Sequence, residues 1–161
     1  MESLMSSASA RADAMLDGAN GTAGAAGIAD GVVGGIVAGA KVLVIDDSNT
    51  IRRSAEIFLR QGGHEVLLAE DGFDALAKVN DHGPDLIFCD ILMPRLDGYQ
   101  TCAIIKRNPR FAHVPVIMLS SKDGLFDKAR GRMVGSQDYL TKPFTKEQLL
   151  RAVETYRCKT P

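Results

Sequence analysis

Cysteine is scarce in this chain, with three among 161 residues, at positions 89, 102 and 158. The number is odd, and no CxxC pair occurs. Without paired spacing, a disulfide scaffold and a zinc ribbon are excluded as the basis of the fold, and a reducing cytoplasm is favoured as the location.

An excess of charge of one sign is also missing, since 19 Lys and Arg stand against 20 Asp and Glu. The formal net charge of −1 gives no reason to expect nucleic acid or an anionic membrane as a partner. A composition that is 45% hydrophobic and 24% charged is typical of a soluble globular protein, and the length fits one domain plus an appendage.

Residues 1–40 have few large side chains, because 11 of them are Ala and 8 are Gly. The first ten residues contain no Lys or Arg, which argues against a signal peptide. Asp30 and the frequent Gly argue against a membrane span. We expect residues 1–40 to form a low-complexity tail that is disordered or loosely helical, or to result from a start site placed too far upstream.

From Lys41 onward the pattern changes. Residues 41–161 carry 18 basic and 16 acidic residues, a formal charge of +2, whereas the tail has one basic and four acidic residues, a charge of −3. Short β-branched runs now alternate with helical patterns. The runs predict strands at residues 41–45, 64–69, 85–89, 115–119 and 138–140. Five such βα units predict an α/β fold with a parallel sheet covered by helices on both faces.

The helices between these strands have recognisable starts and apolar faces. Ser48 and Asp71 are expected to cap the first two, and Thr145 with Gln148 forms a capping box before the last. The third is expected over 96–107, and the fourth is expected to end near Val134. The apolar residues expected on these helices are Ile51, Ala55, Phe58 and Leu59; Phe73, Leu76 and Ala77; Ala129 and Met133; and Leu149, Leu150, Val153 and Tyr156.

Chemically distinctive residues follow four of the five strands, and folds of this kind place their sites at that edge of the sheet. They are Asp46 and Asp47, Asp90, Ser120 and Ser121, and Thr141, Lys142 and Pro143. Three carboxylates in one place would repel one another unless a cation joined them, and oxygen ligands favour Mg²⁺. The lysine and the hydroxyl supply what a bound phosphoryl group needs. The pattern therefore predicts a phosphoryl-binding metal site with one carboxylate free to act as a nucleophile.

Each of these features has an ordinary explanation when it stands alone. Acidic residues and serines after strands are commonly helix caps, and a Lys-Pro pair is commonly an exposed turn. All four at the ends of different strands are hard to explain as caps. The occurrence of all four features together therefore favours a functional site over ordinary helix caps and turns.

The stretches VIDDS, FCDILMPRLDG, VIMLSS and YLTKPF resemble the signatures of the CheY-like receiver domains of two-component response regulators. The resemblance covers roughly residues 41–157 and implies a flavodoxin-like, doubly wound five-stranded parallel sheet of order 2-1-3-4-5, with residues 158–161 as the C-terminal end. The stretches TIRRSAE, EDGFDALAKV and MPRLDGYQTC, with the residues from Pro115 to Ser136, are most similar to receivers of the type IV pilus systems that control twitching motility.

The resemblance implies that Asp90 accepts the phosphoryl group from a CheA-like sensor histidine kinase. Asp47 would bind Mg²⁺ directly and Asp46 through water, with Asp90 and the Leu92 backbone carbonyl as further ligands. Mn²⁺ is an alternative ion, and no other cofactor is implied.

The resemblance also implies that Lys142 pairs with the phosphoryl oxygens and that its bond to Pro143 is cis. Ser120 would supply the hydroxyl that bonds the phosphoryl group, and Tyr139 would be the aromatic switch, although a half-buried residue at a strand edge is the alternative for Tyr139. For Cys89 we expect a core thiol rather than a redox group, because an apolar strand raises the pKa of a thiol.

The resemblance places signal output on the surface of the fourth helix, fifth strand and fifth helix. Leu125 and Phe126 are two large apolar residues on a helix whose inner face is expected to be filled by Ala129 and Met133. Exposed apolar pairs of this kind often mark partner sites. The expected partner surface consists of Lys122, Leu125, Phe126, Lys128 and Tyr139.

Other functional classes fit the residues less well. An Asp-nucleophile phosphatase of the haloacid dehalogenase kind needs a DxD pattern after strand one, where Asp46-Asp47-Ser48 stands instead. A flavodoxin needs a hydroxyl- and glycine-rich phosphate loop there. A DNA-binding regulator is disfavoured because only residues 156–161 follow the last helical stripe.

We therefore expect a single-domain response regulator rather than an enzyme, although it would assist its own phosphorylation and dephosphorylation. It would signal by docking to a protein effector, for instance a pilus motor component, as a monomer or an activation-linked dimer. A chemotaxis-type receiver acting on a flagellar motor or another target is the alternative. The expected location is the cytoplasm, with recruitment to the cell pole as a further possibility.

Overall fold

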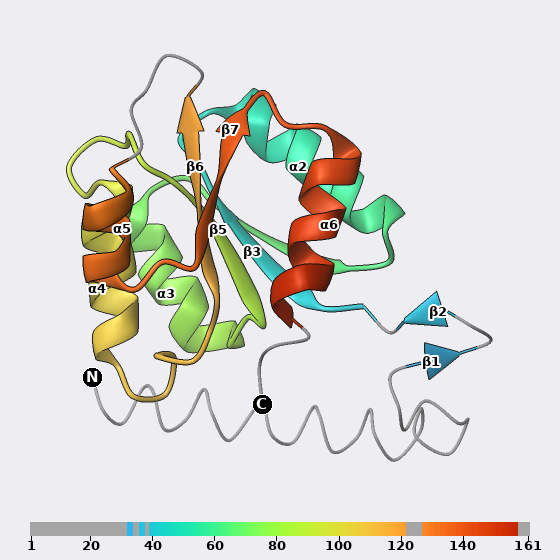
Figure 1. Ribbon diagram of the computed structural model, residues 1–161, viewed down its shortest axis with the longest axis horizontal. Helices are drawn as coiled ribbons and strands as arrows, with labels where there is room; N and C mark the ends of the chain where they lie inside the picture. Colours follow the sequence, from blue (N-terminus) through green and yellow to red (C-terminus); the bar gives the residue numbers. More distant parts are fainter. Residues whose placement is uncertain (1–31, 34–35, 38, 122–126, 158–161) are drawn as a thin grey trace.

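The computed structural model describes residues 32–33, 36–37, 39–121 and 127–157, and its main body is one five-stranded parallel sheet wrapped by helices (Figure 1). The strand order is β4-β3-β5-β6-β7, which is 2-1-3-4-5 within this sheet, so the predicted topology is confirmed. The strands are β3 (Lys41–Ile45), β4 (Glu65–Ala69), β5 (Leu86–Asp90), β6 (Val116–Ser121) and β7 (Asp138–Lys142).

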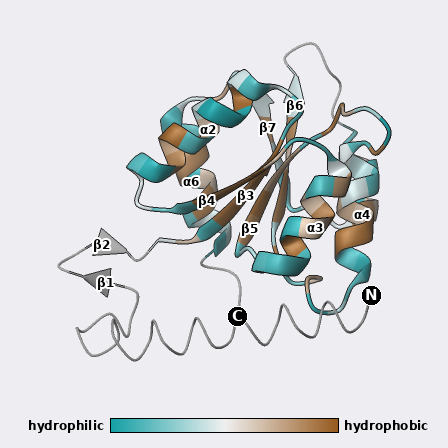
Figure 2. Ribbon diagram, turned by 180° about the vertical axis from the view of Figure 1, so that it is seen from behind, coloured by the Kyte–Doolittle hydropathy of each residue, from teal (hydrophilic) through white to brown (hydrophobic). Residues whose placement is uncertain are grey.

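Helices cover both faces of the sheet, as right-handed βα crossovers require (Figure 2). In the two views α2 and α6 lie together on one face, while α3, α4 and α5 follow one another on the other. The helices are α2 (Asn49–Gln61), α3 (Gly72–His82), α4 (Gly98–Arg107), α5 (Lys128–Val134) and α6 (Lys146–Arg157).

Helices α2, α3 and α6 begin at the capping residues that the sequence predicts. The side chain of Ser48 accepts a hydrogen bond from Ile51 N, and that of Asp71 accepts one from Asp74 N. Thr145 and Gln148 exchange two hydrogen bonds between side chain and backbone, which confirms the predicted capping box at the start of α6.

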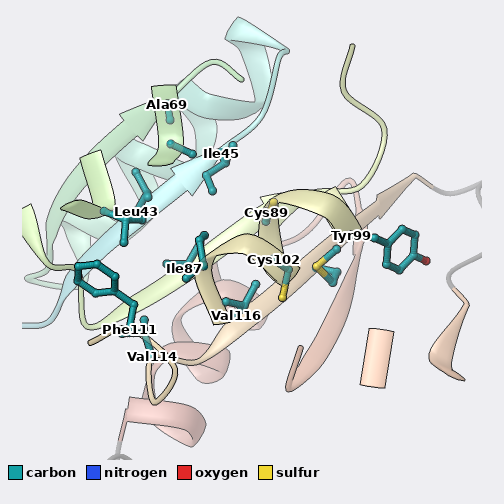
Figure 3. Packing of buried hydrophobic residues seen from close by; sticks show 14 of the residues in the cluster. Leu43, Ile45, Ala69, Ile87, Cys89, Tyr99, Cys102, Phe111, Val114 and Val116 are labelled. Atoms are coloured by element: carbon teal, nitrogen blue, oxygen red, sulfur yellow. The ribbon is translucent and has the colours of Figure 1, made fainter. Parts of the chain in front are cut away.

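The strands are buried on both faces, so the sheet separates two hydrophobic clusters. One cluster packs under α3 and α4 and contains Ile87, Cys89, Tyr99 and Cys102 (Figure 3). The other packs under α2 and α6 around Phe88. Every residue of β5 is buried, which makes it the rigid centre of the fold and gives Asp90, at its end, a fixed position.

The predicted inner face of α5 was wrong. Met133 is 86% exposed and Ala129 is also exposed, while Gly131 is buried and Val134 packs against the core. The close approach of α4 explains this rotation, because Cys102 Sγ lies 3.4 Å from the Val134 carbonyl oxygen.

The expected apolar face of α3 was only partly right. Leu76 packs against the core, but Phe73 is 54% exposed and Ala77 is also exposed. The buried positions are instead small, because a Cβ at Gly72 would lie 2.5 Å from Thr101 Oγ1 of α4.

Several boundaries differ by one or two residues from the sequence prediction. The middle strand starts at Leu86 and includes Asp90, whereas Asp85 stays exposed and bonds the Lys41 backbone through its side chain. Strand β7 extends through Lys142, because Thr141 and Lys142 continue the ladder with β6.

The N-terminal end of the domain begins before Lys41. Ala40 is 2% exposed, and its N–H donates to Nδ1 of the buried His64 at 3.0 Å. Further upstream, β1 (Val32–Val33) and β2 (Ile36–Val37) pair antiparallel. The rest of the tail prediction lies outside the described residues. Across the described residues, no helix has the length and apolarity needed to cross a bilayer.

Candidate phosphoryl and metal site

Three carboxylates meet at the carboxyl edge of the sheet. Asp46 follows β3 and is fully buried, Asp90 ends β5 and is 3% exposed, and Asp47 is exposed to solvent. Each offers an oxygen, and these oxygens lie within 4.8 Å of one another. Two neighbouring strands bring them together, because β3 and β5 pair in parallel with Ile45 opposite Cys89.

Lys142 reaches into this cluster from the end of β7. Its Nζ donates to Asp90 Oδ1 at 3.0 Å and to Asp46 Oδ2 at 3.2 Å. The side chain is only 16% exposed, so the ammonium is a largely desolvated charge between two buried carboxylates. Charge-assisted hydrogen bonds of this kind are strong and fix the lysine in place.

One lysine does not neutralise the site. Burial raises the pKa of Asp90 to about 6, repulsion from Asp46 adds to the rise, and the hydrogen bond from Lys142 only partly offsets it. For Lys142, burial alone would lower the pKa, but the hydrogen bond and attraction from Asp90, with those from Asp46, outweigh burial and raise it. The site therefore holds an excess negative charge centred on Asp90 and would be stabilised by a further cation.

The orientation of Asp46 is fixed by its backbone neighbours. The Ser48 N–H donates to Asp46 Oδ1 at 2.8 Å, which leaves Oδ2 for Lys142. Arg52, one turn into α2, donates to the Asp46 carbonyl oxygen at 2.6 Å and to Asn49 Oδ1 at 3.2 Å. The start of α2 is thus fastened to the end of β3.

A glycine allows the loop after Asp90 to turn back. The Gly98 N–H donates to the Ile91 carbonyl at 2.8 Å. A Cβ at position 98 would lie 2.3 Å from the Asp90 carbonyl oxygen, a distance no side chain tolerates. The α4 N-terminus therefore rests directly on the residue that carries the acceptor carboxylate.

Ser120 lies opposite Thr141 on the neighbouring strand β7 and is 5% exposed. Its hydroxyl contacts the Ser121 carbonyl oxygen at 3.3 Å. Ser120, Asp90 and Lys142 thus stand on three consecutive strands of the sheet, β6, β5 and β7, at the same edge.

The donor set suits a hard divalent cation. Oxygens bound to one Mg²⁺ at about 2.1 Å lie roughly 3–4 Å apart, so carboxylates already within 4.8 Å need only a small movement. Asp47 is exposed and can accept an ion with its waters, which matches the reluctance of Mg²⁺ to lose its hydration shell.

Comparison with known proteins agrees with this geometry. Residues 42–154 match the family model described as the response regulator receiver domain. The chain belongs to that family. It is 66% identical over 118 residues to protein PilG of Pseudomonas aeruginosa, covering 73% of this chain and 87% of PilG. It is 38% identical to protein PilH of the same organism, covering 71% of this chain and 94% of PilH.

Solved receiver structures share the fold. The chemotaxis protein CheY4 of Vibrio cholerae superposes with a TM-score of 0.70 at 34% identity, covering 74% of this chain and 99% of that one. A putative response regulator from Chloroflexus aurantiacus gives a TM-score of 0.71 at 32% identity, covering 74% of this chain and 98% of that one. The chain is a two-component response regulator receiver.

Two further expectations for the receiver are confirmed. The Lys142–Pro143 peptide bond is cis, as predicted. Cys89 is fully buried, and burial raises its pKa well above the usual range, with repulsion from Cys102 and Asp90 adding to the effect. Cys89 is therefore a core thiol, as expected (Figure 3).

The predicted partner surface of the receiver is described only in part. Tyr139 is partly buried against the core beneath α3 and α4, and Lys128 Nζ lies 5.9 Å from the centre of its ring. Lys122, Leu125 and Phe126 lie outside the described residues. The expected roles of the Leu92 carbonyl as a metal ligand and of Ser120 and Tyr139 as the switch stay predictions.

Three residues that position the site were not singled out from the sequence. Arg52 belongs to the stretch TIRRSAE, which was quoted for the family resemblance, but nothing in the sequence predicted its hydrogen bond to the Asp46 carbonyl oxygen. Arg95 adopts a positive φ of 69° and pairs with Asp71 at 2.8 Å, and Gly98 is required by backbone contact alone. In the structure Asp97 caps α4 directly before Gly98, and neither residue was singled out from the sequence.

Proposed function

We propose that Asp90 accepts a phosphoryl group from a phosphohistidine of a sensor kinase. The observation that supports this most is its position: the carboxylate ends the most buried strand, lies 3.0 Å from Lys142 Nζ, and has a pKa of about 6. At neutral pH such a carboxylate is mainly ionised and hence nucleophilic.

The transfer exchanges one bond for another. A carboxylate oxygen of Asp90 forms a bond to phosphorus while the bond between phosphorus and the histidine nitrogen breaks, and its electron pair returns to the imidazole. Lys142 would then pair with a phosphoryl oxygen. Its two present hydrogen bonds, to Asp46 and Asp90, already hold its Nζ beside the acceptor carboxylate. The Ser120 hydroxyl would donate to another phosphoryl oxygen.

We propose that Asp47, Asp46 and Asp90 hold Mg²⁺, or Mn²⁺, together with the Leu92 carbonyl. When bound, the ion would lower the repulsion between the carboxylates and an anionic phosphoryl donor. The excess negative charge around Asp90 supports this assignment. The same site would assist later hydrolysis of the aspartyl phosphate, so the protein is a signalling receiver and not a conventional enzyme.

Signal output to the effector would result from the negative charge that phosphoryl transfer adds at Asp90. Ser120 would move toward the phosphoryl group, and Tyr139 would fill the space behind it, since the two residues are on the neighbouring strands β6 and β7. The partly buried ring of Tyr139 supports a role as a two-position switch.

We propose that the signalling system is one that controls type IV pili and twitching motility, with a CheA-like kinase as donor and a cytoplasmic protein effector. The 66% identity to PilG supports this choice over a chemotaxis-type target, because identity to CheY4 is 34%. Recruitment to the cell pole would place the receiver beside the pili.

Phosphotransfer to small donors tests the acceptor role. The protein is incubated with acetyl phosphate and Mg²⁺ and weighed intact, beside Asp90→Asn and the matched surface control Asp81→Asn. We expect a gain of about 80 Da, one phosphoryl group, in the wild type and in Asp81→Asn only when Mg²⁺ is present. A gain that persists in Asp90→Asn would refute the assignment.

Complementation tests the choice of system. The wild-type chain and Asp90→Asn are expressed in a Pseudomonas aeruginosa strain that lacks PilG and does not twitch. Restored twitching with the wild type alone is expected. Failure of a stably expressed, phosphorylatable wild type would favour a chemotaxis-type target instead.

A further inference from the structure

Helices α4 and α5 lie on the face of the sheet that carries α3 (Figure 1). They border a groove of about 290 Å³. Its floor is apolar and includes Tyr99, Ile104 and Val134, and Arg107 and Arg130 stand beside it. Ile104 is 38% exposed although it is a large aliphatic residue. An apolar floor next to arginines suits an amphipathic segment that carries acidic residues.

Two arginines, Arg107 and Arg130, line this groove. The same two helices and the loop after α4 carry four more cations, Lys106, Arg110, Lys128 and Arg132, of which Lys128 and Arg132 line the neighbouring pocket beside Tyr139. Arg130 stacks on Tyr99 at 4.3 Å and reaches Asp97 at 3.7 Å, and Lys106 Nζ bonds the Ala112 carbonyl oxygen. Among the residues that the structure describes, Arg107 and Arg132 have no carboxylate within ion-pair distance.

The same chain contains a segment with the complementary pattern. In residues 1–17, all the large apolar side chains, with Ala8 and Ala12, fall at 1, 4, 5, 8, 12, 15 and 16, which is helical spacing, and only Ala10 and Ala14 fall off this stripe. Glu2, Asp13 and Asp17 project along one edge of that stripe on a helical projection. Three of the six methionines of the chain fall in this segment, and methionine adapts well to open grooves.

The segment can reach the groove within one molecule. All eight glycines of residues 1–40 lie between 18 and 39, so a glycine-rich linker separates the stripe from the domain. The 14 residues from 18 to 31 alone span up to about 45 Å when extended. A domain of this size is roughly 35 Å across.

We propose that residues 1–17 dock in the groove between α4 and α5 of the same chain. The apolar stripe would lie over Ile104, and the acidic edge would face Arg107 and Arg130. This contact would join the −3 tail to the +2 domain, the two parts that the charge count separates. It is independent of the phosphoacceptor role.

Paramagnetic relaxation in the full-length protein tests the contact. A spin label is attached through Ser9→Cys in a Cys158→Ser background, since Cys89 and Cys102 are buried and do not compete. Selective broadening of amide signals from α4 and α5, relative to α2 and α6, is expected. Added salt should weaken the broadening, because exposed charge pairs are screened.

Matched variants separate docking from random encounter. Arg107→Glu and Ile104→Ser are each expected to lower the ratio of docked to free tail roughly 3–10-fold, from the loss of an ion pair or of apolar burial. Arg151→Glu makes the same charge change at an exposed position of α6 and should leave the broadening in place.

Three results would overturn the proposal. One is broadening spread evenly over the domain or centred on α6. Another is broadening at α4 and α5 that survives both Arg107→Glu and Ile104→Ser. The third is broadening of α4 and α5 signals in unlabelled, isotope-enriched chains when spin-labelled chains without isotope enrichment are added, which would mean that the tail binds a second copy.

Discussion

Lys142 Nζ lies 3.0 Å from Asp90 Oδ1 and 3.2 Å from Asp46 Oδ2, although 52 and 96 residues separate these partners in the sequence. Within the described part of the chain, Lys142 is the one cation at ion-pair distance from these two carboxylates, so two buried carboxylates share one positive charge. The fold thus keeps a surplus of negative charge at Asp90, and this surplus makes the stability of the protein depend on pH.

Replacing Asp90 by Asn should stabilise the metal-free protein at alkaline pH. The folded-state pKa of about 6 lies above the unfolded value near 3.8, so the stability that the neutral carboxyl contributes is lost as pH rises through about 6. Asp90→Asn cannot ionise and should raise the free energy of unfolding by about 1–3 kcal/mol at pH 8. The gain should disappear near pH 4.

Urea unfolding in the presence of a chelator, at several pH values, measures this difference. The control is Asp81→Asn, an exposed carboxylate on α3, which should change stability little at any pH. Equal stability of Asp90→Asn and wild type at pH 8 would mean that the buried charge is better compensated than the contacts indicate.

Lys142→Met should have the opposite effect. Removing the ammonium leaves Asp46 and Asp90 buried without a countercharge, a change that typically costs about 3–5 kcal/mol. The loss should be smaller near pH 5, where the carboxyls can take up protons. Carbon-detected NMR should also show the Asp90 pKa above the wild-type value of about 6.

Lys146→Met is the control for that experiment, because within the described part of the chain Lys146 has no carboxylate at ion-pair distance. If Lys142→Met and Lys146→Met were equally stable, the lysine would not hold the carboxylates together.

Asp47→Asn should separate metal binding from folding. Asp47 is exposed, and its side-chain hydrogen bond with Asp90 helps to raise the pKa of Asp90 rather than to hold the fold together, so the metal-free stability should change by less than about 1 kcal/mol. The rise in Tm with increasing Mg²⁺ should be lost or shifted to at least roughly tenfold higher concentration. An unchanged Mg²⁺ response would place the ion elsewhere.

Gly98→Ala should disturb the acceptor loop. The added methyl would lie 2.3 Å from the Asp90 carbonyl oxygen and 2.8 Å from Ile91 Cα, so backbone has to move. We expect a loss of about 2–4 kcal/mol in stability and slower phosphorylation of the folded fraction. Wild-type rates and stability would show that the loop adapts without cost.

The two buried thiols should be unreactive in the folded protein. Burial raises the pKa of Cys102 to about 11 and that of Cys89 well above its usual range, so the thiolate is nearly absent at pH 7. Alkylation followed by peptide mapping should modify these positions only after denaturation. Rapid native labelling of Cys89 would contradict the packing around it.

The site could be predicted from sequence because its residues follow strands whose pattern is unambiguous. Asp46, Asp90 and Lys142 each end a short apolar or β-branched run, and parallel pairing brings such ends to one edge. The strand order came from the resemblance rather than from periodicity, which does not distinguish neighbouring strands.

The errors arose where helix orientation depends on close contact. Met133 and Phe73 are large and apolar, so periodicity favoured burial, yet both are exposed. In each helix a glycine, Gly131 or Gly72, is buried in place of a large apolar residue. At Gly72 a Cβ would lie 2.5 Å from Thr101 Oγ1 of α4, and hydrophobicity scales carry no information about such close contacts.

The most direct test of the account is to identify the residue that carries the phosphoryl group. After reaction with acetyl phosphate and Mg²⁺, borohydride reduces an aspartyl phosphate to homoserine, and tandem mass spectrometry locates the converted residue. The account predicts conversion at Asp90 and at no other acidic residue. Conversion at Asp46 or Asp47, at the end of β3, would contradict it and would favour the chemistry of an Asp-nucleophile phosphatase.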